Sequence, residues 1–110
     1  KEMQLITQLC KQYQVQLCSD EIHCDLIMEG THQPAGKYDQ NAITLMAASK
    51  TFNIAGLGCS FAVIPDANVR QQFQQQALGL VPWPNLLGYV ATEAAFTYGA
   101  DWHQQLLQYH

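Results

Sequence analysis

Two reactive side chains follow short apolar segments of the sequence. Asp20 comes shortly after residues 15–18, and Lys50 comes shortly after residues 43–48. Both segments have the length and composition of short buried strands. Ligands of open α/β sheets bind beyond the carboxyl ends of the strands. A carboxylate and an amine on neighbouring strand ends would therefore face one ligand.

This combination favours pyridoxal phosphate as the ligand. That cofactor needs a lysine for its Schiff base and an acid that keeps its pyridine nitrogen protonated. The lysine has to be partly deprotonated near neutral pH, which burial or a cationic neighbour brings about. The alternative is that neither residue binds a ligand. A lysine after a strand is commonly a solvated surface residue, and an aspartate there commonly caps a turn.

The surrounding pattern predicts an α/β fold with about three strands and flanking helices. Strands are expected at residues 15–18, 43–48 and 59–64, with a loop over residues 30–40. Helical spacing indicates helices over residues 1–13, 66–78, 85–99 and 101–110. Asp66, Asn85 and Asp101 are residue types suited to cap the last three helices.

Each expected helix carries one stripe of apolar residues, which predicts a buried face. The stripes in chain order are Leu5, Ile6, Leu9 and Tyr13; Val69, Phe73 and Ala77; Leu86, Val90, Ala94 and Tyr98; and Trp102, Leu106 and Tyr109. His32 is expected to be a structural loop residue, whereas His103 and His110 are expected to be exposed on the last helix.

The composition restricts the class of protein. The 110 residues are 48% hydrophobic and carry a formal charge of −4, with only five basic residues. Without a basic patch, neither nucleic acid nor an anionic membrane is an expected partner. No apolar run approaches the roughly 20 residues that a membrane span needs. The sequence thus indicates one small domain or a piece of a larger one.

The four cysteines bear on compartment and metal binding. Nothing else in the sequence indicates secretion, so reduced thiols in a cytoplasmic protein are favoured. A zinc site formed by Cys18, His23, Cys24 and Cys59 is the alternative. The spacing argues against it, because no Cys-x2-Cys or His-x3-His pair is present. No metal is therefore expected.

Two motifs and a tail resemble a known enzyme family. The motifs are Ser19-Asp20-Glu21-Ile22-His23-Cys24-Asp25-Leu26 and Ser49-Lys50-Thr51-Phe52-Asn53-Ile54-Ala55-Gly56-Leu57, and the tail contains Asn85, Ala94-Ala95, Tyr98, Gly99 and Trp102. In this order they resemble the fold-type I pyridoxal-phosphate enzymes. Within these, the chain is most similar to the PatB/MalY-like cystathionine β-lyase (C–S lyase) branch of the class I/II aminotransferase family. The resemblance covers nearly the whole chain.

The resemblance implies the aspartate aminotransferase fold, with the chain as a fragment of it. Residues 1–80 would form the later part of the large cofactor-binding domain, and residues 81–110 would lead to the small C-terminal domain. The full-length enzyme would be a homodimer that cleaves cystathionine or another S-substituted cysteine to a thiol, pyruvate and ammonia. An aminotransferase, or an isolated fragment without activity, is the alternative.

The resemblance also implies roles for single residues. Lys50 matches the catalytic lysine that binds the cofactor, and Asp20 matches the carboxylate that pairs with its ring nitrogen. His23 stands where many relatives have a tyrosine that bonds the cofactor's phenolic oxygen. Ile22 would pack on the ring, and Ser49 would contact the phosphate.

Three further positions qualify the resemblance. Asn85 lies in the loop that, in dimers of the family, approaches the cofactor of the partner subunit. Gly58 stands where many aminotransferases carry a phosphate-binding arginine, and Ala47 stands where a phosphate-binding hydroxyl is common. The glycine fits the lyase branch, but both differences leave phosphate binding unexplained.

Overall fold

The computed structural model describes residues 1–109, so the expectation for His110 lies outside the described residues. The chain divides into two compact units. The first unit comprises Lys1–Asp20, Gln33–Leu45 and Ala62–Pro82. The second comprises Glu21–His32, Met46–Phe61 and Trp83–His110.

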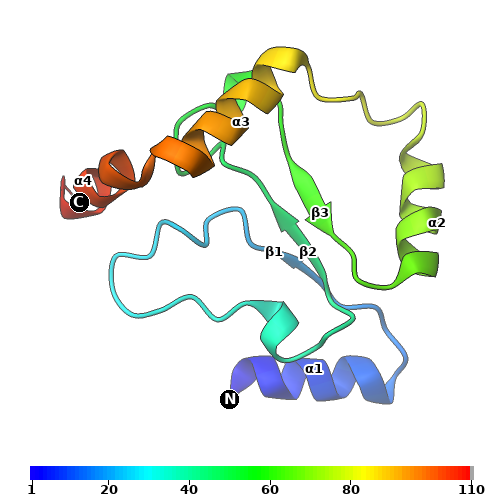
Figure 1. The fold of residues 1–110 in the computed structure, drawn as a ribbon. Coiled ribbons are helices and arrows are strands. Elements are labelled where there is room, and N and C mark those ends of the chain that lie inside the picture. The colour runs from blue at the N-terminus through cyan, green and yellow to red at the C-terminus, as the bar shows by residue number, and fades with distance from the viewer. Residues whose placement is uncertain (110) are drawn as a thin grey trace. The chain divides into compact units, whose positions relative to one another are not determined.

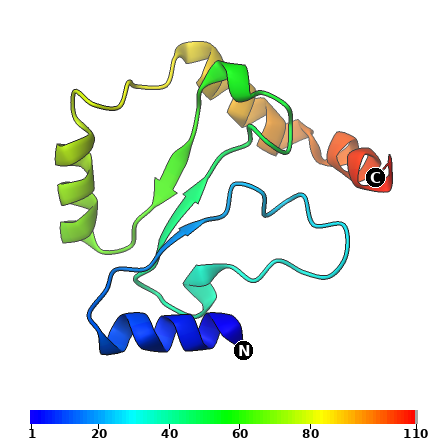
Figure 2. The same cartoon turned by 180° about the vertical axis from the view of Figure 1, so that it is seen from behind.

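The predicted three-stranded sheet is confirmed. Its strands β1 (Cys18–Asp20), β2 (Ile43–Met46) and β3 (Phe61–Val63) lie in the order β1-β2-β3 (Figure 1). β1 and β2 are parallel, and Asp20 of β1 is in register with Leu45 of β2. Figure 2 shows the strands from the opposite side, with β3 antiparallel to β2. The sheet is therefore mixed.

Two strands begin later than the sequence predicts. The backbone N–H of Val15 still donates to Cys10 O at the end of the first helix, and Gln14 has a φ of 54°. The chain is thus bonded to the helix terminus up to Val15, and the first bond to β2 is made at Leu17, whose O accepts from Ile43 N. Before β3, a 3-10 turn η2 (Ala55–Leu57) and a left-handed Gly58 delay the extended conformation.

The first unit contains helices α1 (Glu2–Gln12) and α2 (Ala67–Ala77), as predicted. Asp66 caps α2, because its carboxylate accepts from the N–H groups of Asn68 and Val69. The buried face of α1 was predicted wrongly. Its large apolar residues are exposed, and its buried residue is Thr7.

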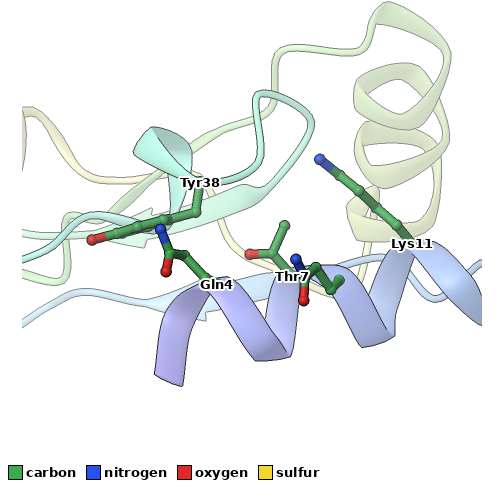
Figure 3. A pocket seen from close by; sticks show the side chains of 5 residues that line it. Gln4, Thr7, Lys11 and Tyr38 are labelled. Atoms are coloured by element: carbon green, nitrogen blue, oxygen red, sulfur yellow. The ribbon is translucent and has the colours of Figure 1, made fainter. Parts of the chain in front are cut away.

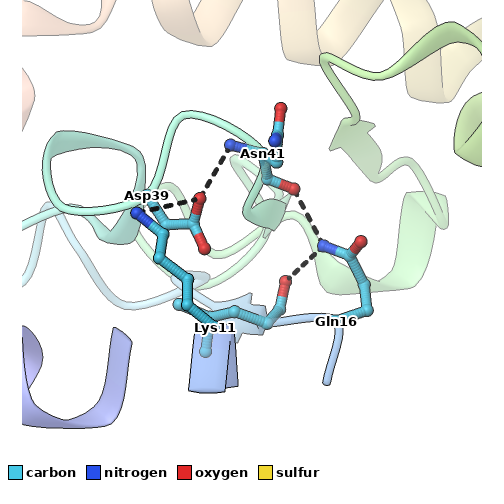
Figure 4. Close-up of polar contacts among 5 residues, drawn as sticks. Lys11, Gln16, Asp39 and Asn41 are labelled. Atoms are coloured by element: carbon cyan, nitrogen blue, oxygen red, sulfur yellow. Dashed lines mark hydrogen bonds and ion pairs between the residues drawn. The ribbon is translucent and has the colours of Figure 1, made fainter. Parts of the chain in front are cut away.

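A polar cluster joins the two segments that lead into β1 and β2 (Figure 4). The Gln16 side chain donates to the backbone oxygens of Leu17 and Asn41. Asp39 accepts from Asn41 N and lies 4.0 Å from the amine of Lys11. Asp39 is itself buried, two residues after the end of the short 3-10 helix η1 (Ala35–Lys37). These bonds fix the start of the parallel strand pair.

The second unit contains helices α3 (Leu86–Tyr98) and α4 (Ala100–Tyr109). Asn85 caps α3 as predicted, since its Oδ1 accepts from Gly88 N. The predicted apolar stripe of α3 is wrong, because its buried residue is Gly88. A Cβ at Gly88 would lie 2.6 Å from Leu57 O, so only glycine permits this close approach.

The prediction for α4 needs two corrections. The helix begins at Ala100, so Asp101 lies in its first turn and is not the cap. Tyr109, expected to be buried, is 86% exposed, and Trp102 is 46% exposed. The buried apolar core of residues 1–109 consists mostly of alanine, and many large apolar side chains in these residues are exposed. Among the helices of residues 1–109, none has the length and apolar character that a membrane span requires.

Candidate functional site

Lys50 lies in a compact turn immediately after β2. Phe52 N donates to Ala48 O at 2.9 Å, and Ile54 N donates to Ser49 O at 3.1 Å. Ala48 and Thr51 are 0% and 1% exposed, whereas Lys50 is exposed. No ion pair joins Lys50 to a carboxylate of residues 1–109. The turn is therefore closed by backbone hydrogen bonds and buried at Ala48 and Thr51, and the amine of Lys50 is accessible.

An aromatic cluster holds this turn within the second unit. The Phe52 ring lies 6.2 Å from Phe96, 5.6 Å from Trp102 and 6.1 Å from His103, between ring centroids. A Cβ at Gly99 would collide with the Phe52 ring, so the end of α3 passes directly over it. The position of Phe52, and with it the turn of Lys50, is set by the α3–α4 junction.

Ile22 and His23 lie in a second turn, residues 21–26. Cys24 N donates to Glu21 O at 2.9 Å, and Leu26 N donates to His23 O at 3.0 Å. His23 is exposed and Ile22 is half-buried, so both side chains are accessible to a ligand. The turn thus presents an imidazole and an apolar side chain side by side in sequence.

Two histidines anchor this second turn. His32 Nε2 lies 2.7 Å from the buried Glu21 carboxylate, which confirms the structural role predicted for His32. His103 Nε2 lies 2.6 Å from the backbone oxygen of Asp25, which is 78 residues away in sequence. The prediction that His103 is exposed was wrong, because it is half-buried in this contact. No local sequence pattern indicates a contact between residues so far apart in the sequence.

The remaining predicted residues occupy the following positions. Asp20 is exposed at the carboxyl end of β1, and its register partner Leu45 precedes Lys50 by five residues of continuous chain. Ser49 is half-buried directly before Lys50. Asn85 uses its amide within the second unit, donating from Nδ2 to Leu57 O at 3.0 Å besides capping α3.

The described cysteines are all free thiols. Burial raises the pKa of the Cys24 thiol, and the nearby Asp25 carboxylate, through its charge and a hydrogen bond, raises it further, with a smaller contribution from Glu21. Cys24 is therefore protonated at neutral pH, and it is not an activated nucleophile. Within residues 1–109, no three of the His, Cys, Asp and Glu side chains form a group that could hold a metal ion.

A shallow polar pocket of about 320 Å³ lies on α1, in the first unit. Gln4, Thr7, Gln8, Lys11 and Tyr38 line it. Figure 3 shows Gln4, Thr7 and Lys11 projecting from the side of α1 that faces Tyr38. None of the residues predicted from the sequence to bind a ligand lines this pocket, so it is separate from the candidate site.

Comparison with known proteins identifies the relatives of the chain. A family model described as "Aminotransferase class I and II" matches residues 1–106. Cystathionine β-lyase PatB of Bacillus subtilis is 38% identical, over 93% of this chain and 28% of that protein. The crystal structure of OvoB matches with a TM-score of 0.94 and 40% identity, over 98% of this chain and 30% of that one.

A third relative is described as bound to a cofactor. The pyridoxal-phosphate-bound C–S lyase of Staphylococcus hominis matches with a TM-score of 0.87 and 38% identity. The match covers 98% of this chain and 28% of that chain. The chain thus spans less than a third of the length of these three relatives.

Proposed function

Because the chain belongs to the aminotransferase class I and II family, we propose that it is a segment of a pyridoxal-phosphate-dependent carbon–sulfur β-lyase. The observation that carries the proposal is the exposed Lys50, on a turn that follows the largely half-buried parallel strand β2. The similarity to proteins named cystathionine β-lyase and C–S lyase supports the reaction type. The substrate would be cystathionine or another S-substituted cysteine.

The side chains present fit the cofactor chemically. Lys50 offers an amine, Asp20 a carboxylate, His23 an imidazole and Ser49 a hydroxyl, and the first three residues are exposed. Thr51 Oγ1, beside Lys50, is buried and has no hydrogen-bond partner within residues 1–109. These groups match the amine, acid and polar contacts that pyridoxal phosphate needs.

Each residue of the candidate site then has a proposed role. Lys50 would bind the cofactor covalently and move the substrate's Cα proton, and Asp20 would hold a proton on the ring nitrogen. When bound, pyridoxal phosphate supplies the electron sink that makes this proton removable. Ile22 would exclude water from one face of the ring, and His23 would donate to the phenolic oxygen. Ser49 would bind the phosphate.

The proposal extends to the architecture of the whole protein. Residues 1–80 would belong to the large cofactor-binding domain, and residues 81–110 would lead to the small domain. The enzyme would act as a homodimer, with the loop of Asn85 close to the cofactor of the second subunit. A cytoplasmic location agrees with the free thiols of the described cysteines, since disulfides are rare in that compartment.

The first experiment labels the lysine. The protein is incubated with pyridoxal phosphate, reduced with borohydride and digested, and the phosphopyridoxyl group is mapped by mass spectrometry. A single tag on Lys50, absent from Lys50→Arg, is the expected result. Tags spread equally over Lys1, Lys11 and Lys37, or no tag on Lys50 in the full-length protein, would contradict the proposal.

The second experiment separates the lyase from an aminotransferase. The full-length protein is given cystathionine without a keto-acid co-substrate, and pyruvate is measured. A β-lyase releases pyruvate repeatedly under these conditions. An aminotransferase stops after one half-reaction, because it then needs a keto acid to regenerate the cofactor. Release of no more than one equivalent of keto acid would favour the aminotransferase.

A further inference from the structure

His103 contacts two turns that are far apart in sequence. Its Nε2 lies 2.6 Å from the backbone oxygen of Asp25, in the turn of residues 21–26. Its ring centroid lies 6.1 Å from that of Phe52, two residues after Lys50. These residues belong to the second compact unit. One imidazole on α4 therefore links the turn of residues 21–26 to the turn of Lys50.

The contact with Asp25 fixes the tautomer of this histidine. A carbonyl oxygen only accepts hydrogen bonds, so Nε2 must carry the hydrogen and donate it. The bond is partly buried, which limits the competition from water. The turn that contains Asp25 is already closed by its two internal backbone bonds. The bond from His103 therefore holds a preformed turn at one end and does not create it.

We propose that His103 is a positioning residue, which holds the turn of Ile22 and His23 in a fixed relation to the turn of Lys50. The consequence for the cofactor rests on the proposed function, because Ile22, His23 and Lys50 are the residues assigned to cofactor binding there. The link itself rests only on the two contacts of His103. Loss of the Nε2–H donor of His103 would leave the internal bonds of each turn intact. The turn of residues 21–26 could then move relative to the turn of Lys50.

Cys24 provides a reporter of this link that needs no cofactor. It lies inside the turn, one residue before Asp25, and it is half-buried. A turn that moves away from α4 exposes this thiol to alkylation. Cys10, on α1 in the first unit, serves as the internal control, because it reports general unfolding and not movement of this turn.

Two variants of His103 separate hydrogen bonding from packing. His103→Gln keeps an N–H donor at the end of a side chain of similar reach, and His103→Leu keeps much of the volume without a donor. A net hydrogen bond of this kind corresponds to roughly a fivefold change in the equilibrium for opening. We expect alkylation of Cys24 to be about fivefold faster in His103→Leu and within about twofold of the unmodified protein in His103→Gln.

The same two variants are then loaded with pyridoxal phosphate. Cofactor dissociation, followed by its visible absorbance, should be faster in His103→Leu and restored in His103→Gln. Equal Cys24 rates in the two variants would overturn the inference without affecting the proposed function. Faster alkylation with unchanged cofactor dissociation would overturn the positioning role and leave only a structural bond. A missing tag on Lys50 in the unmodified protein would instead contradict the proposed function, while the Cys24 comparison would still measure the link.

Discussion

The Glu21 carboxylate lies 2.7 Å from the Nε2 atom of His32, and only 5% of its side chain is exposed. Glu21 directly follows Asp20 and opens the turn that carries Ile22 and His23. A carboxylate at this depth is stable only when polar groups compensate its lost hydration. The histidine thus allows an acidic residue to be buried at the start of this turn.

Removal of the Glu21 carboxylate should destabilise the fold. Glu21→Ala leaves His32 without this acceptor, and we expect the free energy of unfolding to fall by about 1–3 kcal/mol in urea denaturation. Glu21→Gln should cost less, because an amide oxygen still accepts from the imidazole. Glu29→Ala, at an exposed position, is the matched control. Equal losses in Glu21→Ala and Glu29→Ala would show that the pair contributes nothing.

A methyl group at Gly99 should also destabilise the protein. The added Cβ of Gly99→Ala would collide with the Phe52 ring and with Ala95 O. We expect a loss of about 1–3 kcal/mol, as for other overpacked sites. Gly56→Ala is the control, because a Cβ there meets no atom within 4 Å. Equal melting temperatures of the two variants would show that an added Cβ at Gly99 does not collide with Phe52.

Neutralising Asp25 should make Cys24 more reactive. The Asp25 carboxylate contributes, after burial, to the raised pKa of the Cys24 thiol. In Asp25→Asn this pKa falls, so the rise of the alkylation rate with pH moves to lower pH. We expect alkylation at pH 8 to be faster in Asp25→Asn than in the unmodified protein, because a larger share of the thiol is then ionised. The rate at Cys18 in the same sample should stay constant, and an unchanged Cys24 rate would exclude the carboxylate as a cause.

Replacing the buried hydroxyl of Thr51 should stabilise this chain. Its Oγ1 has no hydrogen-bond partner within residues 1–109, and the residue is 1% exposed. Thr51→Val removes an uncompensated polar group at nearly constant shape, and we expect a gain of about 1 kcal/mol. Thr51→Ser keeps the hydroxyl and loses the methyl group, so it should be less stable than the unmodified protein. A valine variant less stable than the unmodified protein would indicate that the hydroxyl has a partner.

The sequence by itself determined the three strands and four α-helices of residues 1–109, and where the reactive residues fall along the chain. Capping chemistry is local, and for this reason Asp66 and Asn85 were placed correctly at the starts of α2 and α3. The short apolar run before Lys50 was likewise sufficient to predict β2. The two motifs around Asp20 and Lys50, together with the tail that contains Asn85, Tyr98, Gly99 and Trp102, were sufficient to indicate the family.

Only the tertiary structure decided which helix faces are buried and which distant residues meet. Large apolar side chains predict a buried face, yet α3 packs through Gly88, because a close approach to Leu57 depends on small size and not on hydrophobicity. The contact of His103 with Asp25 joins residues 78 positions apart. Periodicity reports only neighbours along one element, so it carries no information about a contact between separate elements.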